Sequence, residues 1–118
     1  MATVSPTESI LDSIKLGCGG GIKPEYTNFD DQLIPLINTT FSVLTQLGVG
    51  PKEGFSISDR TTTWDEYLQD NKILNMVITY MQLSVNIVFD QPANSFVLNS
   101  MKERLKEYEW RINMEVDP

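Results

Sequence analysis

The chain has 118 residues, of which 41% are hydrophobic, 16 are acidic and 9 are basic, so its formal net charge at pH 7 is −7. This length predicts one domain over residues 1–118, with flexible ends at 1–7 and 114–118. The acidic balance and the lack of a Lys/Arg cluster argue against binding nucleic acid through its phosphates. A single cysteine and no histidine exclude an intrachain disulfide and remove the commonest general base and metal ligand.

The first predicted helix begins at Pro6 or Thr7, ends at Gly17 and presents one apolar side formed by Ile10, Leu11 and Ile14. Residues 17–21, Gly-Cys-Gly-Gly-Gly, predict a flexible connector. A phosphate-binding loop is disfavoured because no Lys-Ser or Lys-Thr pair follows these glycines.

The second predicted helix begins after Asn28, a potential N-cap, and carries Asp30 and Asp31 in its first turn, where the helix dipole favours negative charge. Pro35 removes one backbone hydrogen bond, so we expect a kink there. Gly48 predicts a left-handed end to this helix. Apolar residues recur through it at helical spacing: Leu33, Ile34, Ile37, Phe41, Leu44 and Leu47.

Residues 49–62 form one long irregular stretch, in which Phe55 and Ile57 alternate with small residues as in a short extended segment. These two apolar side chains are expected to anchor the loop. Residues 63–66, Thr-Trp-Asp-Glu, have the capping-box pattern and open a short helix in which Trp64 is available for packing.

Residues 73–89 contain no charged side chain. Polar residues in and around this segment recur at steps of three and four: Lys72, Asn75, Thr79, Gln82, Asn86 and Asp90. The spacing places them on one line of a helix, and the remaining apolar circumference needs cover from other elements or subunits. The polar line faces solvent, another subunit or a lumen. A membrane span is not predicted, because unpartnered amide side chains are costly in lipid.

The last predicted helix covers residues 95–113, is capped by Asn94 or Ser95, and follows a short turn at Pro92. Its predicted packing stripe consists of Val97, Leu98, Met101, Leu105, Tyr108 and Ile112. The short turn predicts that helices 73–89 and 95–113 run antiparallel. The fold class is therefore all-α: a small bundle of four to five helices with a C-terminal helix hairpin and one long irregular loop.

The residues predict no catalytic, cofactor-binding or metal site, because the acidic pairs at 30–31 and 65–66 sit at helix starts and Cys18 has no activating neighbour. Protein contact is the remaining role. Trp110 lies off the packing stripe beside Arg111, which makes both candidates for an interface; Trp64 is a third, with burial in the core as its alternative. Along the polar line, the interface candidates are Asn75, Gln82 and Asn86.

Six segments, taken in order, resemble the small head-tail connector (adaptor) proteins of long-tailed bacteriophages: 29–38 (FDDQLIxxIN), 44–51 (LTQLGVGP), 54–59 (GFSISD), 63–64 (TW), 89–92 (FDxP) and 109–112 (EWRI). The resemblance covers roughly residues 8–113. The glycine run at 19–21 and Pro35 depart from the family pattern, and both concern the orientation of the first helix.

The resemblance implies a structural protein of the virion neck, assembled in the host cytoplasm and without catalytic residues. It implies a homo-oligomeric ring, usually dodecameric, that docks on the portal protein and presents a platform for head-closure or tail-completion proteins. DNA would pass through its lumen without sequence-specific binding, which suits an acidic protein. The alternative from the residues alone is a cytosolic helical adaptor or regulatory module that binds a partner helix in a groove.

Overall fold

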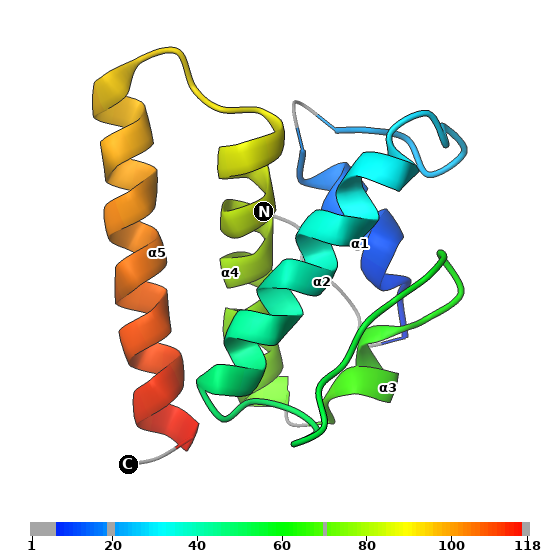
Figure 1. The fold of residues 1–118 in the computed structure, drawn as a ribbon, viewed down its shortest axis with the longest axis vertical. Coiled ribbons are helices and arrows are strands. Elements are labelled where there is room, and N and C mark those ends of the chain that lie inside the picture. The colour runs from blue at the N-terminus through cyan, green and yellow to red at the C-terminus, as the bar shows by residue number, and fades with distance from the viewer. Residues whose placement is uncertain (1–6, 19–20, 70, 117–118) are drawn as a thin grey trace.

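The computed structural model describes residues 7–18, 21–69 and 71–116. Within them it contains no strand and five helices: α1 (Ile10–Leu16), α2 (Asp30–Gln46), α3 (Trp64–Tyr67), α4 (Asn71–Phe89) and α5 (Ser95–Val116). The predicted all-α fold is confirmed, including the antiparallel α4–α5 hairpin and the irregular segment between α2 and α3 (Figure 1). Residues 1–6 and 117–118, which make up most of the two ends predicted to be flexible, lie outside the described residues.

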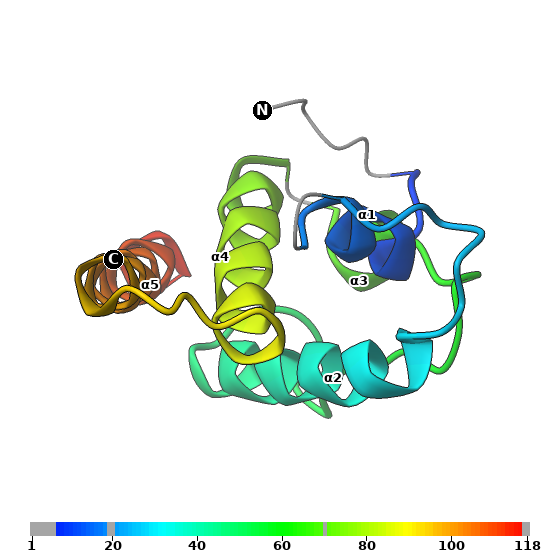
Figure 2. The same cartoon turned by 90° about the horizontal axis from the view of Figure 1, so that it is seen from above.

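Helix α4 is the centre of the fold. It lies between α5 on one side and α1 with α3 on the other, while α2 crosses it (Figures 1 and 2), and it contacts α1, α2 and α5. Its length and composition would also suffice for a membrane span, a property shared by core helices of soluble proteins. Cover by three helices explains why residues 73–89 carry no charge. Its buried side consists of Leu74, Val77, Ile78, Tyr80, Met81 and Val85.

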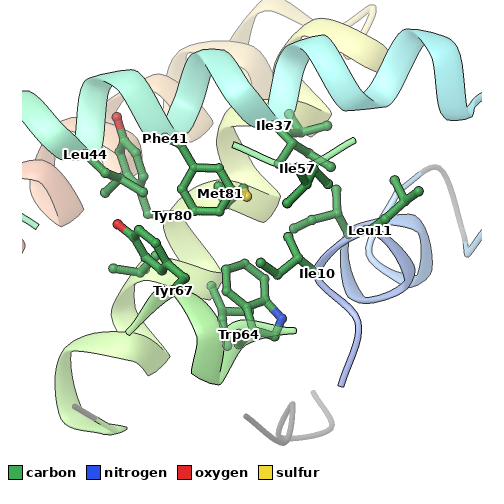
Figure 3. Close-up of a cluster of buried hydrophobic side chains, with 14 of the residues drawn as sticks. Ile10, Leu11, Ile37, Phe41, Leu44, Ile57, Trp64, Tyr67, Tyr80 and Met81 are labelled. Carbon is green, nitrogen blue, oxygen red and sulfur yellow. The ribbon is translucent and has the colours of Figure 1, made fainter. Parts of the chain in front are cut away.

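The core between α2, α3 and α4 is built around Phe41 (Figure 3). The Phe41 ring centroid lies 4.6 Å from that of Tyr67 and 6.4 Å from that of Trp64. Trp64 is fully buried, and its Nε1 donates a hydrogen bond to Ser13 Oγ over 3.1 Å. The interface prediction for Trp64 is therefore corrected to its core alternative, because an indole whose single donor has an internal partner can be buried at little cost.

The long loop is held by side chains from α2. Asn38 Nδ2 donates to the Ile57 carbonyl over 3.0 Å, and Asn38 Oδ1 accepts from the Ile57 amide over 2.8 Å. The amide side chain thus replaces a neighbouring strand, and the predicted extended segment forms no strand. Ile57 is buried and Phe55 packs edge-on against Phe41, which confirms that these two residues anchor the loop.

Three predicted helix signals are confirmed. Gly48 adopts a φ of +92° directly after α2, where a left-handed residue ends the helix. The capping box opens α3, with Glu66 Oε2 accepting from the Thr63 amide over 2.7 Å. Asn94 caps α5, because its Oδ1 accepts from the Phe96 amide over 2.8 Å.

The predicted start of the first helix is wrong. Helix α1 begins at Ile10, not at Pro6 or Thr7, and Ser9 caps it through a 3.2 Å hydrogen bond from the Asp12 amide. The residues before it pair with a distant part of the chain: Ser9 forms an antiparallel bridge with Thr63. Local pattern could not reveal this pairing, since the partner lies more than fifty residues away.

Two other helix ends also differ from the predictions. Phe29 rather than Asn28 occupies the N-cap of α2 and forms no side-chain cap bond. Helix α5 continues to Val116, beyond the predicted end at residue 113, because Val116 packs against the core beside Gly48. Helix α2 continues through Pro35, and the kink predicted there stays a prediction.

Lys15 forms a buried ion pair and hydrogen bonds that the sequence did not indicate. Its side chain is buried, and Nζ lies 2.9 Å from Asp30 Oδ1 and donates to the carbonyls of Pro24 and Tyr26. These contacts fasten the segment before α2 to the end of α1. The buried ammonium is tolerated because two carbonyls accept hydrogen bonds from it and the nearby Asp30 carboxylate balances its charge.

Candidate functional site

The only cysteine lies in the core of the fold. Cys18 is fully buried, and burial together with the negative charge of Asp90 raises the pKa of its thiol to about 11. The thiol therefore stays protonated near neutral pH. Across residues 7–18, 21–69 and 71–116, no group of three or more His, Cys, Asp or Glu side chains is placed to hold a metal ion.

Helices α4 and α5 carry the five interface candidates that remain after Trp64. Trp110, Arg111 and Asn75 are exposed, whereas Gln82 and Asn86 are half-buried. Trp110 and Arg111 line one hollow, Gln82 and Asn86 line a second, and Asn75 lines neither. The predicted polar line is thus divided: its first part faces outward and its second part borders other elements.

The first hollow, of about 330 Å³, surrounds Trp110. Trp110 is 64% exposed and Met114 is 47% exposed, and Met76 of α4 forms the opposite wall. We call these three residues the tryptophan end, since they lie toward the start of α4 and the end of α5 (Figure 1). An exposed tryptophan flanked by methionines has the composition of a protein contact site.

The charges around the tryptophan end are paired within the chain. Arg111 lies 2.7 Å from Glu107, and Lys72 lies 3.3 Å from Glu115. All four side chains are at least one-third exposed, so each pair contributes little to stability and is easily rearranged. The hollow therefore presents an apolar floor with a balanced polar rim.

The second hollow, of about 190 Å³, lies along the polar line and is lined by Gly17, Thr79, Gln82, Leu83, Asn86 and Arg104. Gln82 approaches the end of α1 so closely that a Cβ on Gly17 would lie 3.1 Å from its Nε2. The Asn86 Oδ1 atom is buried without a hydrogen-bond partner among the described residues. This part of the polar line is therefore partly covered within the chain rather than fully open to solvent.

A second group of exposed apolar side chains was missed by the sequence reasoning. It lies where α2 begins, α4 ends and α5 begins, at the upper edge of Figure 1. Phe96 is 84% exposed, and the rings of Phe29 and Phe89 meet edge-on at 5.4 Å. We use the name turn end for the apolar residues near these three helix ends, of which Phe29 and Phe89 are in ring contact: Tyr26, Phe29, Val88, Phe89, Phe96 and Val97.

The prediction that Val97 belongs to the packing stripe is wrong. Val97 is 47% exposed, whereas Leu98, Leu105 and Ile112 are covered to different degrees. The reason is geometric: α5 begins beyond the edge of the neighbouring helices, so its first turn has little to pack against. Phe96, directly after the Asn94 cap, was the available signal for this surface, because a large aromatic residue there falls outside the stripe.

A third hollow, of about 520 Å³, lies over α2 and the long loop and has a different character. It is lined by Ser42, Thr45, Gln46, Glu53, Gly54, Phe55 and Ser56. The hydroxyls of Ser42 and Thr45 are already bonded to carbonyls one turn earlier in α2. Apart from Phe55, its lining carries no large apolar side chain, unlike that of the tryptophan end.

The comparisons with known proteins returned one match. A family model described as phage connector protein matches residues 10–118. No curated protein and no solved structure matches the chain.

Proposed function

Because the chain belongs to the phage connector protein family, and so is a structural component of the phage head-tail junction, we propose that it is the protomer of an adaptor ring. The ring docks on the portal protein, extends the DNA channel and joins the capsid to tail or head-closure proteins. This proposal assigns protein contacts to the tryptophan end and the turn end, which we call the two apolar ends.

The observation that carries the proposal is the distribution of exposed apolar side chains. Among the described residues, every large exposed apolar side chain except Leu16 belongs to the tryptophan end or the turn end. Large apolar side chains that gather in exposed places are candidates for protein contact. Exposed apolar side chains of this kind are expected on a protomer whose neighbours cover them in the assembled ring.

Charge supports the proposed role of the lumen. With 16 acidic and 9 basic residues, the chain offers few contacts to phosphates, and each such contact would add affinity and slow the passage of DNA. An acidic ring can therefore surround DNA without holding it.

The test is to mix the purified chain with the portal protein of the same phage. We expect co-migration in size-exclusion chromatography with light scattering, and added ring-shaped density on the portal by electron microscopy. Trp110→Ala should weaken ring formation while leaving the helical circular dichroism unchanged. Ser42→Ala, in the polar hollow over α2, is the matched control and should assemble normally.

A chain that neither self-associates nor binds the portal protein at high concentration would contradict the proposal. If that monomer instead bound an amphipathic peptide through the Trp110 hollow, the helical adaptor would be the better description.

A further inference from the structure

The proposed ring assigns no role to the hollow of about 520 Å³ over α2 and the long loop. We call it the α2 hollow. One side comes from the last two turns of α2 and the other from the long loop. Its lining consists of Ser42, Thr45, Gln46, Glu53, Gly54, Phe55 and Ser56.

The polar atoms on the α2 side of the hollow are hydrogen-bond acceptors. Ser42 Oγ donates to the Asn38 carbonyl over 3.3 Å, and Thr45 Oγ1 donates to the Phe41 carbonyl over 3.0 Å. A hydroxyl has a single proton, so both groups keep only lone pairs for a ligand. The backbone carbonyl of Gln46, in the last turn of α2, accepts no hydrogen bond among the described residues. These atoms suit a ligand that donates hydrogen bonds.

The charge of the lining is negative. Glu53 is the one charged side chain that lines the hollow, is exposed, and forms no ion pair among the described residues. Lys52 precedes it in the chain but does not line the hollow. Helix α2 has no basic residue in its last turn, so no side chain there compensates the partial negative charge of the helix C-terminus. Both features favour a cationic ligand.

The aromatic ring of Phe55 narrows the choice of cation. Phe55 is half-buried, and its ring lies 5.1 Å from that of Phe41 and 5.0 Å from that of Tyr67. These contacts hold the ring in place while part of it lines the hollow. A guanidinium group is planar, stacks on aromatic rings, is weakly hydrated and carries several N–H donors, whereas an ammonium is a strongly hydrated point charge. The lining therefore suits an arginine side chain better than a lysine side chain.

We propose that the α2 hollow binds an arginine side chain of another protein. The guanidinium pairs with the Glu53 carboxylate, donates to the acceptors at the end of α2 and stacks on Phe55. Another protein is favoured over a second copy because the chain has a net charge of −7, so that two copies repel each other whereas a basic partner is attracted. The inference does not rest on the proposed ring, because a single chain carries the whole lining.

The test uses NMR spectra of the isotope-labelled full chain, titrated with acetyl-arginine methylamide. We expect saturable shifts of the backbone amides of Ser42, Gln46, Glu53 and Ser56. Acetyl-citrulline methylamide is the control probe, because its urea group has the shape of a guanidinium without the charge. It should bind at least about tenfold more weakly, since hydrogen bonds from a charged donor are the stronger ones.

Two variants of neighbouring exposed residues test the role of the carboxylate. Glu53→Gln removes the negative charge at nearly constant size and should weaken binding of the arginine probe at least about fivefold. Lys52→Gln, which removes the adjacent positive charge, is the matched control and should not weaken it. Equal binding of the arginine and citrulline probes, or a Glu53→Gln chain that binds like the wild type, would overturn the inference.

Two further measurements test other occupants. Acetyl-lysine methylamide that binds as tightly as the arginine probe would make the hollow a general cation site and overturn the assignment to arginine. Arg104 is an exposed arginine without an ion pair among the described residues, and so is the group that a second copy could offer. We expect Arg104→Gln and Glu53→Gln to self-associate like the wild type in light scattering. An equal loss of self-association in both variants would show that a second copy fills the hollow.

Discussion

Helices α4 and α5 lie side by side with similar lengths, 19 and 22 residues, yet they do different work. Helix α4 is charge-free between Ile73 and Phe89 and buries side chains against three neighbours. Helix α5 has a single fully covered residue, Ile112, and carries most of the charge of the hairpin. The contrast indicates that α4 holds the fold together, whereas α5 leaves most of its surface exposed, which is where we propose that other chains bind.

The largest expected difference in stability is between variants of the two tryptophans. Trp64→Ala should destabilise the fold by about 4 kcal/mol, because it opens a cavity beside Phe41 and removes the hydrogen bond that Ser13 Oγ accepts. Trp110→Ala should change the free energy of unfolding by less than about 1 kcal/mol, because its side chain is mostly in water. Urea denaturation followed by circular dichroism measures both. A strong loss of stability for Trp110→Ala with normal assembly would show that it is a core residue.

The next largest expected effect concerns the Lys15 contacts that connect α1 to the segment before α2. Lys15→Met should cost about 3 kcal/mol, since it leaves Asp30 without its cation and two carbonyls without a donor. Lys23→Met is the exposed control and should shift the unfolding midpoint little. Equal midpoints for the two variants would mean that the buried ammonium contributes no stability.

Two glycines of the long loop allow two smaller effects on stability to be compared. Gly50 has a φ of +78°, and an added Cβ would lie 2.6 Å from the Tyr67 ring, whereas Gly54 has a φ of +98° with open space around it. Gly50→Ala should cost about 2 to 3 kcal/mol, combining backbone strain with a clash, and Gly54→Ala about 1 kcal/mol from strain alone. Thermal unfolding of both variants checks the order, and a reversed order would place Tyr67 elsewhere.

The smallest expected effect comes from a hydrogen bond between α4 and α5. Tyr80→Phe removes the 3.0 Å hydrogen bond from the Tyr80 hydroxyl to Glu109 Oε2 and should cost about 1 kcal/mol at neutral pH. Burial, followed by the bond to Glu109, raises the pKa of Tyr80 in the folded state. The wild-type chain should therefore lose stability as the pH rises above about 10, where the unfolded tyrosine ionises first.

Denaturation measured across this pH range should show a shallower loss for Tyr80→Phe than for the wild type. Burial also raises the pKa of Tyr67, so some alkaline loss should remain in the variant. Parallel pH curves for the two proteins would mean that Tyr80 ionises alike in both states.

Much of the fold was predictable from local signals. The three-and-four spacing of polar residues indicated α4, and the Thr63–Glu66 capping box and Gly48 marked helix ends that the structure confirms. These signals succeed because each depends on residues within one or two turns of each other. The start of α1 was misplaced because it depends on the bridge between Ser9 and Thr63, a contact between distant parts of the chain.

The candidate surface was only partly predictable, for the same reason. Composition identified tryptophan as the residue type best suited to an interface, and Trp110 is exposed as expected while Trp64 is buried. The turn end was missed because its residues come from the start of α2, the end of α4 and the start of α5, and no single segment displays the cluster.

The sequence by itself determined the helices, the charge-free centre and the acidic balance, because helix periodicity, capping and net charge are local or additive properties. The tertiary structure alone decided which tryptophan is covered, why Lys15 is buried, and which apolar side chains gather at the two ends of the hairpin. Burial depends on what lies opposite a side chain in space, and for this chain the opposite partner is regularly tens of residues away.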